Sequence, residues 1–145
     1  MFKHILIPTD GSDLSNIAVV NGVRFAKEIG AQITGLTVTA PYHYMAVEAI
    51  QVSDTPQRYE EDVKLLAARN LSTLKATAED AGVPLQLVHT SSDFPYEEIV
   101  KTAQEKGCDV IFLASHGRRG VRAVIMGSET TKVLTHTKIP VVVYR

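Results

Sequence analysis

The residues with the clearest chemistry in this sequence are Ala-Ser-His-Gly at positions 114–117 and, after nine intervening residues, Gly127 and Ser128. An apolar run at 110–113 precedes them and is typical of a buried strand, and residues 129–136 indicate a helix. The first N–H groups of a helix lack partners, the helix dipole favours an anion there, and glycine allows close approach. This arrangement therefore indicates a phosphate site, and with it a nucleotide.

A second group of polar residues, Pro8, Thr9 and Asp10, follows the apolar run at 5–7, which predicts a strand ending in a turn. If this strand lies beside the strand that ends at Ala114, the two groups line one crevice. Asp10 could then accept hydrogen bonds from a ribose or a base. Asp10 could instead start the turn or cap the next helix, where aspartate is common. The sequence leaves both roles open.

The loop after residues 114–117 is basic, because it carries Arg118, Arg119 and Arg122. Arginine pairs well with phosphate oxygens, but a solvated basic loop would have the same composition. Ser128 has two compatible roles: it could donate its hydroxyl to a phosphate, or it could cap the helix that it opens.

No catalytic residue and no metal site is predicted. His116 lacks a nucleophile with a matching orienting partner, so we interpret it as a structural or hydrogen-bonding residue. The other histidines have no spacing typical of metal ligands; they are His4, His43, His89 and His136. Two common nucleotide motifs are missing, since Gly127 and Ser128 lack the lysine of a G-x-x-x-x-G-K-[ST] loop and no G-x-G-x-x-G follows the first strand.

Strands and helices are expected to alternate along the chain. Strands are predicted at 5–7, 33–38, 85–88, 110–114 and 140–144, and helices between Ser12 and Gly30, at 57–81, between Asp93 and Gly107, and at 129–136. Ser12 and Asp93 are the expected N-caps of their helices. The strands read as buried and non-alternating, which favours a parallel sheet with helices on both faces. Such sheets bind ligands beyond the C-terminal ends of their strands, at the switch point of the topology.

Two further expectations concern the first helix and the long connection after the second strand. The apolar positions expected to pack from the first helix are Leu14, Ile17, Ala18, Val20, Val23, Phe25, Ala26 and Ile29. Residues 40–56 show no clean period and are read as a long connection with room for a short helix.

Composition favours one soluble domain that spans residues 1–145. The net charge of −1 gives no general attraction to nucleic acid or to acidic membranes. The one cysteine, Cys108, excludes an internal disulfide and is expected to pack as a small hydrophobic residue. No signal peptide is recognised at the start and no apolar run is long enough to span a bilayer, so we expect a cytoplasmic protein without a membrane partner.

In these segments the chain resembles the universal stress protein family. Residues 5–12 resemble the start of that family, and residues 115–120, 127–128 and 139–143 resemble its close, in the right order over nearly the whole chain. The resemblance implies a Rossmann-like α/β fold of the adenine nucleotide α-hydrolase type, with a five-stranded parallel sheet.

The nucleotide-binding branch of that family has the pattern G-x2-G-x9-G-[S/T] and binds ATP. The resemblance implies that Asp10 meets the adenine or ribose end and that Val38 lines the adenine pocket. Phosphates would be held by Gly117, Gly127, Ser128 and the backbone at Glu129. The remaining residues that we place at the nucleotide are Pro8, Thr9, Ala114, His116, Arg118 and Arg119.

The sequence departs from the pattern at its first glycine, where Ala114 stands. If the backbone φ there is negative, alanine has little effect, whereas a positive φ would make it unfavourable. The extra methyl group could also press on the ribose. We expect ATP binding to survive this change.

The leading hypothesis is a cytoplasmic, ATP-binding stress-response protein that acts as a sensor or regulator. Mg²⁺ would be carried by the phosphates, and any hydrolysis of ATP would be slow. Residues 42–45 could gate access to the adenine side of the site. The family commonly forms homodimers through its last strand, and residues 140–144 are a short apolar strand that such a dimer would cover. The alternatives are a weak ATPase or other nucleotide-dependent enzyme, and a nucleotide-free dimeric interaction module. An additional protein partner, if there is one, is not identified by the sequence.

Overall fold

The computed structural model describes residues 1–42, 55–117 and 126–145, and strands and helices alternate through them. The strands are β1 (His4–Pro8), β2 (Gln32–Thr39), β3 (Leu85–Ser91), β4 (Val110–Ala114) and β5 (Val141–Tyr144). The helices are α1 (Asp13–Ile29), α3 (Pro56–Ala81), α4 (Pro95–Glu105) and α5 (Ser128–His136). Every predicted strand and helix is therefore present in the predicted order. Most of the expected long connection, including residues 43–45 of the proposed gate, lies outside the described residues.

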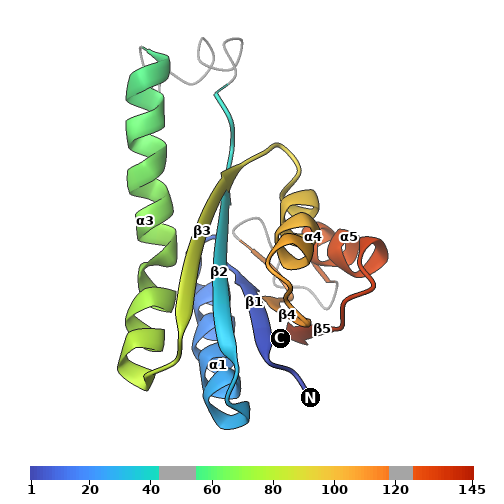
Figure 1. Ribbon diagram of the computed structural model, residues 1–145. Helices are drawn as coiled ribbons and strands as arrows, with labels where there is room; N and C mark the ends of the chain where they lie inside the picture. The colour runs from blue at the N-terminus through green and yellow to red at the C-terminus, as the bar shows by residue number, and fades with distance from the viewer. Residues whose placement is uncertain (43–54, 118–125) are drawn as a thin grey trace.

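The five strands form one parallel sheet in the order β3-β2-β1-β4-β5. Helices α1 and α3 cover one face and α4 and α5 cover the other (Figure 1). The fold class expected from the sequence is thus confirmed. From β1 the chain continues to β2 on one side, whereas β4 lies on the other side. The switch point of this topology therefore lies between β1 and β4, whose C-terminal ends carry the two polar motifs.

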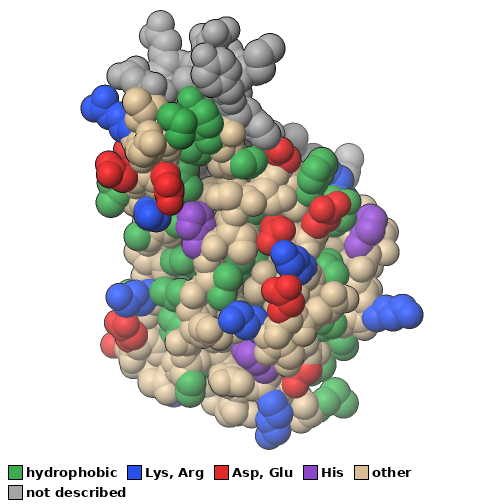
Figure 2. All heavy atoms as spheres, turned by 45° about the horizontal axis from the view of Figure 1, so that its top comes forward, with side chains coloured by type: hydrophobic (Ala, Val, Ile, Leu, Met, Phe, Trp, Pro, Cys, Tyr) green, Lys and Arg blue, Asp and Glu red, His purple; other side chains and the backbone are tan. Residues whose placement is uncertain are grey.

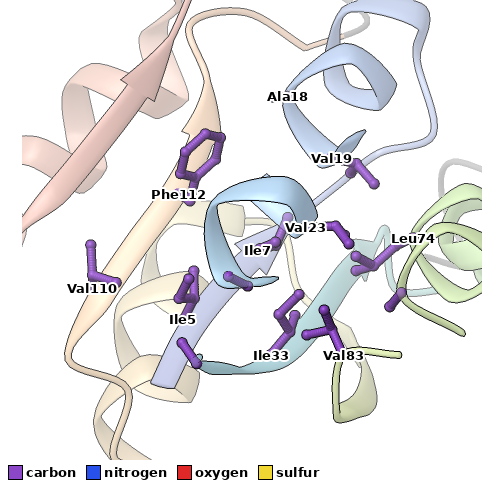
Figure 3. Close-up of a cluster of buried hydrophobic side chains, with 13 residues drawn as sticks. Ile5, Ile7, Ala18, Val19, Val23, Ile33, Leu74, Val83, Val110 and Phe112 are labelled. Atoms are coloured by element: carbon purple, nitrogen blue, oxygen red, sulfur yellow. The ribbon is translucent and has the colours of Figure 1, made fainter. Parts of the chain in front are cut away.

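Both faces of the central strands are buried. Ile5 and Ile7 of β1 pack with Val23 and Leu74 under α1 and α3 (Figure 3). The intervening residue, Leu6, packs on the opposite face beneath α4 and α5. Because successive side chains of a strand point to opposite faces, a strand between two helix layers is apolar throughout.

The outer strands differ from this expectation. Strand β3 was predicted to be buried, but all of its residues are exposed or partly exposed, and Leu87 is 38% exposed. The reason is its place at the edge of the sheet, where it pairs only with β2. Strand β5 is the other edge, and all four of its residues are half-buried.

The buried face of α1 also differs in part from the predicted one. Leu14, Ile17 and Val20 are between 47% and 51% exposed, so their expected burial was wrong. The helix instead buries a stripe of mostly small side chains, namely Ser15, Ala18, Val19, Gly22, Val23 and Ala26. Small residues let the helix lie close to the sheet: a Cβ on Gly22 would lie 2.8 Å from Cδ1 of Ile7.

Cys108 packs as expected, because its side chain is buried just before β4. Burial raises the pKa of its thiol to about 11, which keeps it neutral and unreactive at physiological pH. Among residues 1–42, 55–117 and 126–145, no helix combines the length and apolarity needed to cross a membrane.

Candidate functional site

A cavity of about 540 Å³ opens at the C-terminal ends of β1, β2 and β4. The predicted site residues that line it are Pro8, Thr9, Asp10, Val38, Ala114, His116, Gly117, Gly127, Ser128 and Glu129. The two arginines predicted to join them, Arg118 and Arg119, lie outside the described residues, as does Arg122 of the same loop. On the face shown in Figure 2, with this end of the sheet brought forward, acidic and basic side chains are interspersed.

Asp10 lies where β1 and the loop after β4 meet. Its Oδ1 accepts a hydrogen bond of 2.9 Å from the backbone N–H of Ser12, which is the turn role left open by the sequence. Its Oδ2 lies against Gly117, since a Cβ on that glycine would be only 2.5 Å away. One oxygen of Asp10 therefore holds the turn and the other lies beside the glycine loop, while the predicted contact of Asp10 with a ribose or base stays a prediction.

The residues beside Asp10 form a buried hydroxyl pair that the sequence analysis missed. Thr9 Oγ1 lies 2.7 Å from Ser15 Oγ and also accepts a hydrogen bond from the N–H of Gly11. Ser15 lines the cavity. As the third residue of α1, it donates its own N–H to Ser12 Oγ, so Ser12 is the N-cap as predicted. The spacing of Ser15 three residues after the predicted cap Ser12 was the sequence feature that could have indicated this pair.

The start of α5 is held directly against the end of β4. The N–H of Gly127 donates to the carbonyl of Ser115 at 2.8 Å. Thr130 Oγ1 donates to the carbonyls of Ala114 and Ser115, at 3.0 Å and 3.2 Å. A Cβ on Gly127 would lie 2.9 Å from that same Ser115 carbonyl, so the close approach requires glycine.

Gly127 is also the N-cap of α5, so the suggestion that Ser128 caps this helix is wrong. Gly127 takes the cap position because the chain turns into the helix while pressed against Ser115. Ser128 is the first helical residue, and its exposed side chain is at the cavity. The remaining role considered for Ser128 is to donate its hydroxyl to a ligand.

Three helices begin at this cavity, and they differ in how their first N–H groups are satisfied. Helix α1 is capped by Ser12, and at the start of α4 the N–H of Tyr96 donates to Glu129 Oε2 at 3.0 Å. No side chain among the described residues accepts from the first-turn N–H groups of α5. These groups and the positive end of the helix dipole make α5 the favoured anion site of the three.

The predicted cap of α4, Asp93, was wrong, because Phe94 is the N-cap residue. The N–H of Phe94 donates to Ser92 Oγ at 3.0 Å, and Glu129 accepts from the N–H of Tyr96 in the first turn of α4. Asp93 lines the cavity instead. A carboxylate 33 residues away replaces the local cap, which sequence neighbours alone could not indicate.

Ala114 is the last residue of β4 and pairs with Tyr144 of β5. Its backbone is therefore extended, with a negative φ, which is the case in which alanine has little effect.

The β2 side of the cavity is apolar, with Leu36 and Val38 lining it. The hydroxyl of Thr39 is engaged by His89 Nε2 at 2.7 Å and by Ser91 Oγ at 3.0 Å. Desolvation lowers the pKa of His89. The cavity is also lined by residues that the sequence analysis did not assign to the site, namely Ser15, Leu36, Thr39, Ala40, Ser92, Asp93, Pro95, Ile99, Leu113 and Thr130.

His116 Nδ1 lies 3.0 Å from Ser115 Oγ, in keeping with a hydrogen-bonding role. Ser115 is buried and does not line the cavity, so this pair does not present a nucleophile to a ligand there. In the part of the chain that the structure describes, no group of three or more His, Cys, Asp or Glu side chains is placed to hold a metal ion.

Comparison with known proteins supports one family. Universal stress protein MJ0531 of Methanocaldococcus jannaschii is 29% identical over 147 residues, covering 100% of this chain and 83% of that protein. The solved structure of MJ0577 from the same organism has a TM-score of 0.81 and 26% identity, covering 99% of this chain and 95% of that one. A universal stress protein solved in complex with cAMP shares the fold, with a TM-score of 0.71, 19% identity and coverage of 99% and 97%. The model of the universal stress protein family matches residues 1–145, and this chain therefore belongs to that family.

Proposed function

We propose that this protein binds an adenine nucleotide, ATP in the first place, in the cavity between β1, β2 and β4. It would act as a cytoplasmic, nucleotide-dependent sensor or regulator in the stress response, with slow hydrolysis at most. The observation that carries the proposal is the start of α5. The cap residue of this helix, Gly127, makes no side-chain hydrogen bond to the first-turn N–H groups, so these groups and the positive end of the helix dipole can receive a phosphate.

The lining of the cavity suggests how the nucleotide lies. The apolar side at Leu36 and Val38 suits the adenine ring, and Asp10, which also lines the cavity, would accept hydrogen bonds from the ribose. The phosphates would lie on the backbone of residues 127–129, beside His116 and Gly117. A cavity of about 540 Å³ lies within the usual range for small-molecule sites. The protein solved with cAMP has the same fold, which is consistent with this assignment.

The remaining parts of the assignment stay predictions. Pro8, Thr9 and Ala114 would form the floor of the site, and Arg118 and Arg119 would reach the phosphates from their loop. Mg²⁺ would be carried by the phosphates, because within the described ranges no carboxylate cluster is arranged to hold it. We also propose that residues 1–145 form one domain and that two copies pair through β5.

The test is to denature freshly purified protein, identify any released nucleotide by chromatography and mass, and titrate the stripped protein with Mg-ATP by calorimetry. We expect stoichiometric ATP or micromolar binding. Ser128→Glu should abolish binding, because it adds bulk and negative charge at the exposed first residue of α5, where the phosphate would lie. Gln104→Glu, on the exposed side of α4, adds the same charge outside the cavity and should bind as wild type does.

Two other outcomes would contradict the proposal. No released nucleotide and no heat would favour a nucleotide-free interaction module. Turnover well above background that disappears in His116→Ala or Asp10→Ala would identify an enzyme instead.

A further inference from the structure

Glu129 is placed where its charge bears on the proposed phosphate site. It is the second residue of α5 and lines the cavity. Its Oε2 accepts from the N–H of Tyr96 at 3.0 Å, and its Oε1 lies 3.3 Å from Lys132 Nζ. The ammonium group of Lys132 is also 5.5 Å from the centre of the Tyr96 ring. Both oxygens of the carboxylate are thus held between the starts of α4 and α5.

This arrangement has an electrostatic consequence for an anionic ligand. The carboxylate is fixed beside the same helix N-terminus that would receive the phosphates, and like charges in one partly desolvated cavity repel. Lys132 offsets only part of this charge, because the side chains of the pair are 47% and 42% exposed and solvent weakens their attraction. A phosphate at α5 therefore meets a negative group that its own helix supplies.

We propose that Glu129 sets the preference of this site among adenine nucleotides. Each additional phosphate group brings more negative charge towards the fixed carboxylate, so the loss of affinity caused by Glu129 is largest for ATP, smaller for ADP and smallest for AMP. ATP still binds, but less tightly than it would without this charge. The inference rests on the proposed function, and it states that the site selects among adenine nucleotides by their negative charge. Glu129 is thus a specificity-determining residue whose backbone faces the ligand while its side chain limits the charge that the site accepts.

The geometry offers a clean variant. In Glu129→Gln the amide oxygen can still accept from the N–H of Tyr96, so the start of α4 stays capped while the charge is removed. Glu129→Ala removes both the charge and the cap. Glu105→Gln at the exposed end of α4 is the matched control, because it makes the same change in net charge outside the cavity.

The experiment measures the dissociation constants of ATP, ADP and AMP by calorimetry for wild type and the three variants, with Mg²⁺ and with EDTA, at low and high salt. Glu129→Gln should tighten ATP by about fivefold in EDTA and AMP by less than about twofold. The difference should shrink with Mg²⁺ and with salt, which neutralise or screen the phosphates. Glu105→Gln should change neither affinity.

Three results would count against the inference. Equal changes for ATP and AMP in Glu129→Gln would show that the charge does not discriminate. Weaker binding of Mg-ATP in that variant would make Glu129 a ligand of the cation instead. If wild type and all variants bind no adenine nucleotide, the proposed function itself fails, and the inference falls with it. If only Glu129→Ala loses affinity for every nucleotide, the loss comes from the missing hydrogen bond to the N–H of Tyr96. The effect of charge is then judged from Glu129→Gln against wild type.

Discussion

At the scale of single residues, the glycine pattern of this site serves two different contacts. Gly117 leaves room for the carboxylate of Asp10, because a Cβ there would lie 2.5 Å from Oδ2. Gly127 leaves room for a backbone carbonyl, that of Ser115. Neither glycine has a positive φ, so space and not backbone conformation explains why these positions need glycine. The first position of the pattern, Ala114, is the last residue of a strand and has an ordinary strand conformation that accommodates a methyl group.

Replacing Ala114 by glycine should therefore leave nucleotide binding almost unchanged. We expect the ATP dissociation constant of Ala114→Gly to stay within about threefold of wild type, because the backbone is already extended. The free energy of unfolding should fall by about 0.5–1 kcal/mol, since glycine weakens a strand interior. Calorimetric titration and urea unfolding check the two parts. A large gain in affinity would mean that the methyl group does press on the ribose.

At the scale of elements, two hydroxyl side chains near the N-terminus of α5 have different roles. Thr130 holds the helix in place, whereas Ser128 faces the cavity. Thr130 is buried and ties the helix to the end of β4 through two carbonyls. Ser128 is exposed at the cavity and is not the cap. These residues are two positions apart in the sequence, but only the hydroxyl of Thr130 joins the helix to the end of β4.

The two side chains should respond differently to removal of the hydroxyl. Thr130→Val should lower the free energy of unfolding by about 1–3 kcal/mol, because it removes the donor to two carbonyls. Ser128→Ala should change the free energy of unfolding by less than about 0.5 kcal/mol. It should nevertheless weaken ATP binding by about tenfold, through the lost hydrogen bond to a charged phosphate. Urea unfolding and calorimetry on both variants test this. If Thr130→Val weakened ATP binding and Ser128→Ala lowered stability, Thr130 would be the residue that contacts the phosphate.

At the scale of the whole molecule, the sheet has two edges of different character. Strand β3 is largely exposed, whereas β5 carries four apolar or aromatic residues that are all half-buried in the single chain. The carbonyl of Pro140 accepts from Ile111 of β4, and that of Tyr144 accepts from Ser115 just after β4. Because alternate residues of a strand point to the same side, the N–H of Val143 faces the free edge of the sheet. A second copy of β5 could pair there and cover the strand.

Val143→Pro should therefore convert the proposed dimer to a monomer without unfolding it. Proline removes an N–H that points away from β4, which is the position where an edge strand tolerates it. Size-exclusion chromatography with light scattering at micromolar concentration measures the change, and circular dichroism checks the fold. Leu87→Lys on the opposite edge is the control and should remain dimeric. A dimer that survives Val143→Pro would place the interface elsewhere.

The amino-acid sequence by itself determined the order of elements, the parallel sheet and the two motifs that meet at its switch point. These follow from local patterns: apolar runs make strands such as 110–114, Ser12 caps the helix beside it, and parallel strands bring their C-terminal ends to one edge. The ten described residues predicted for the site all line one cavity for that reason.

Only the tertiary structure decided which distant residues contact each other, both in hydrogen bonds and in the packed core. The start of α4 is served by Glu129 and not by the nearby Asp93, and α1 buries its small residues instead of Leu14 and Ile17. The burial of β3 was misjudged because its mainly apolar start at 85–88 is typical of a buried strand, whereas its place at the edge of the sheet leaves it exposed. In each case the deciding contact joins segments far apart in the sequence, and its free energy depends on packing and desolvation that no local pattern contains.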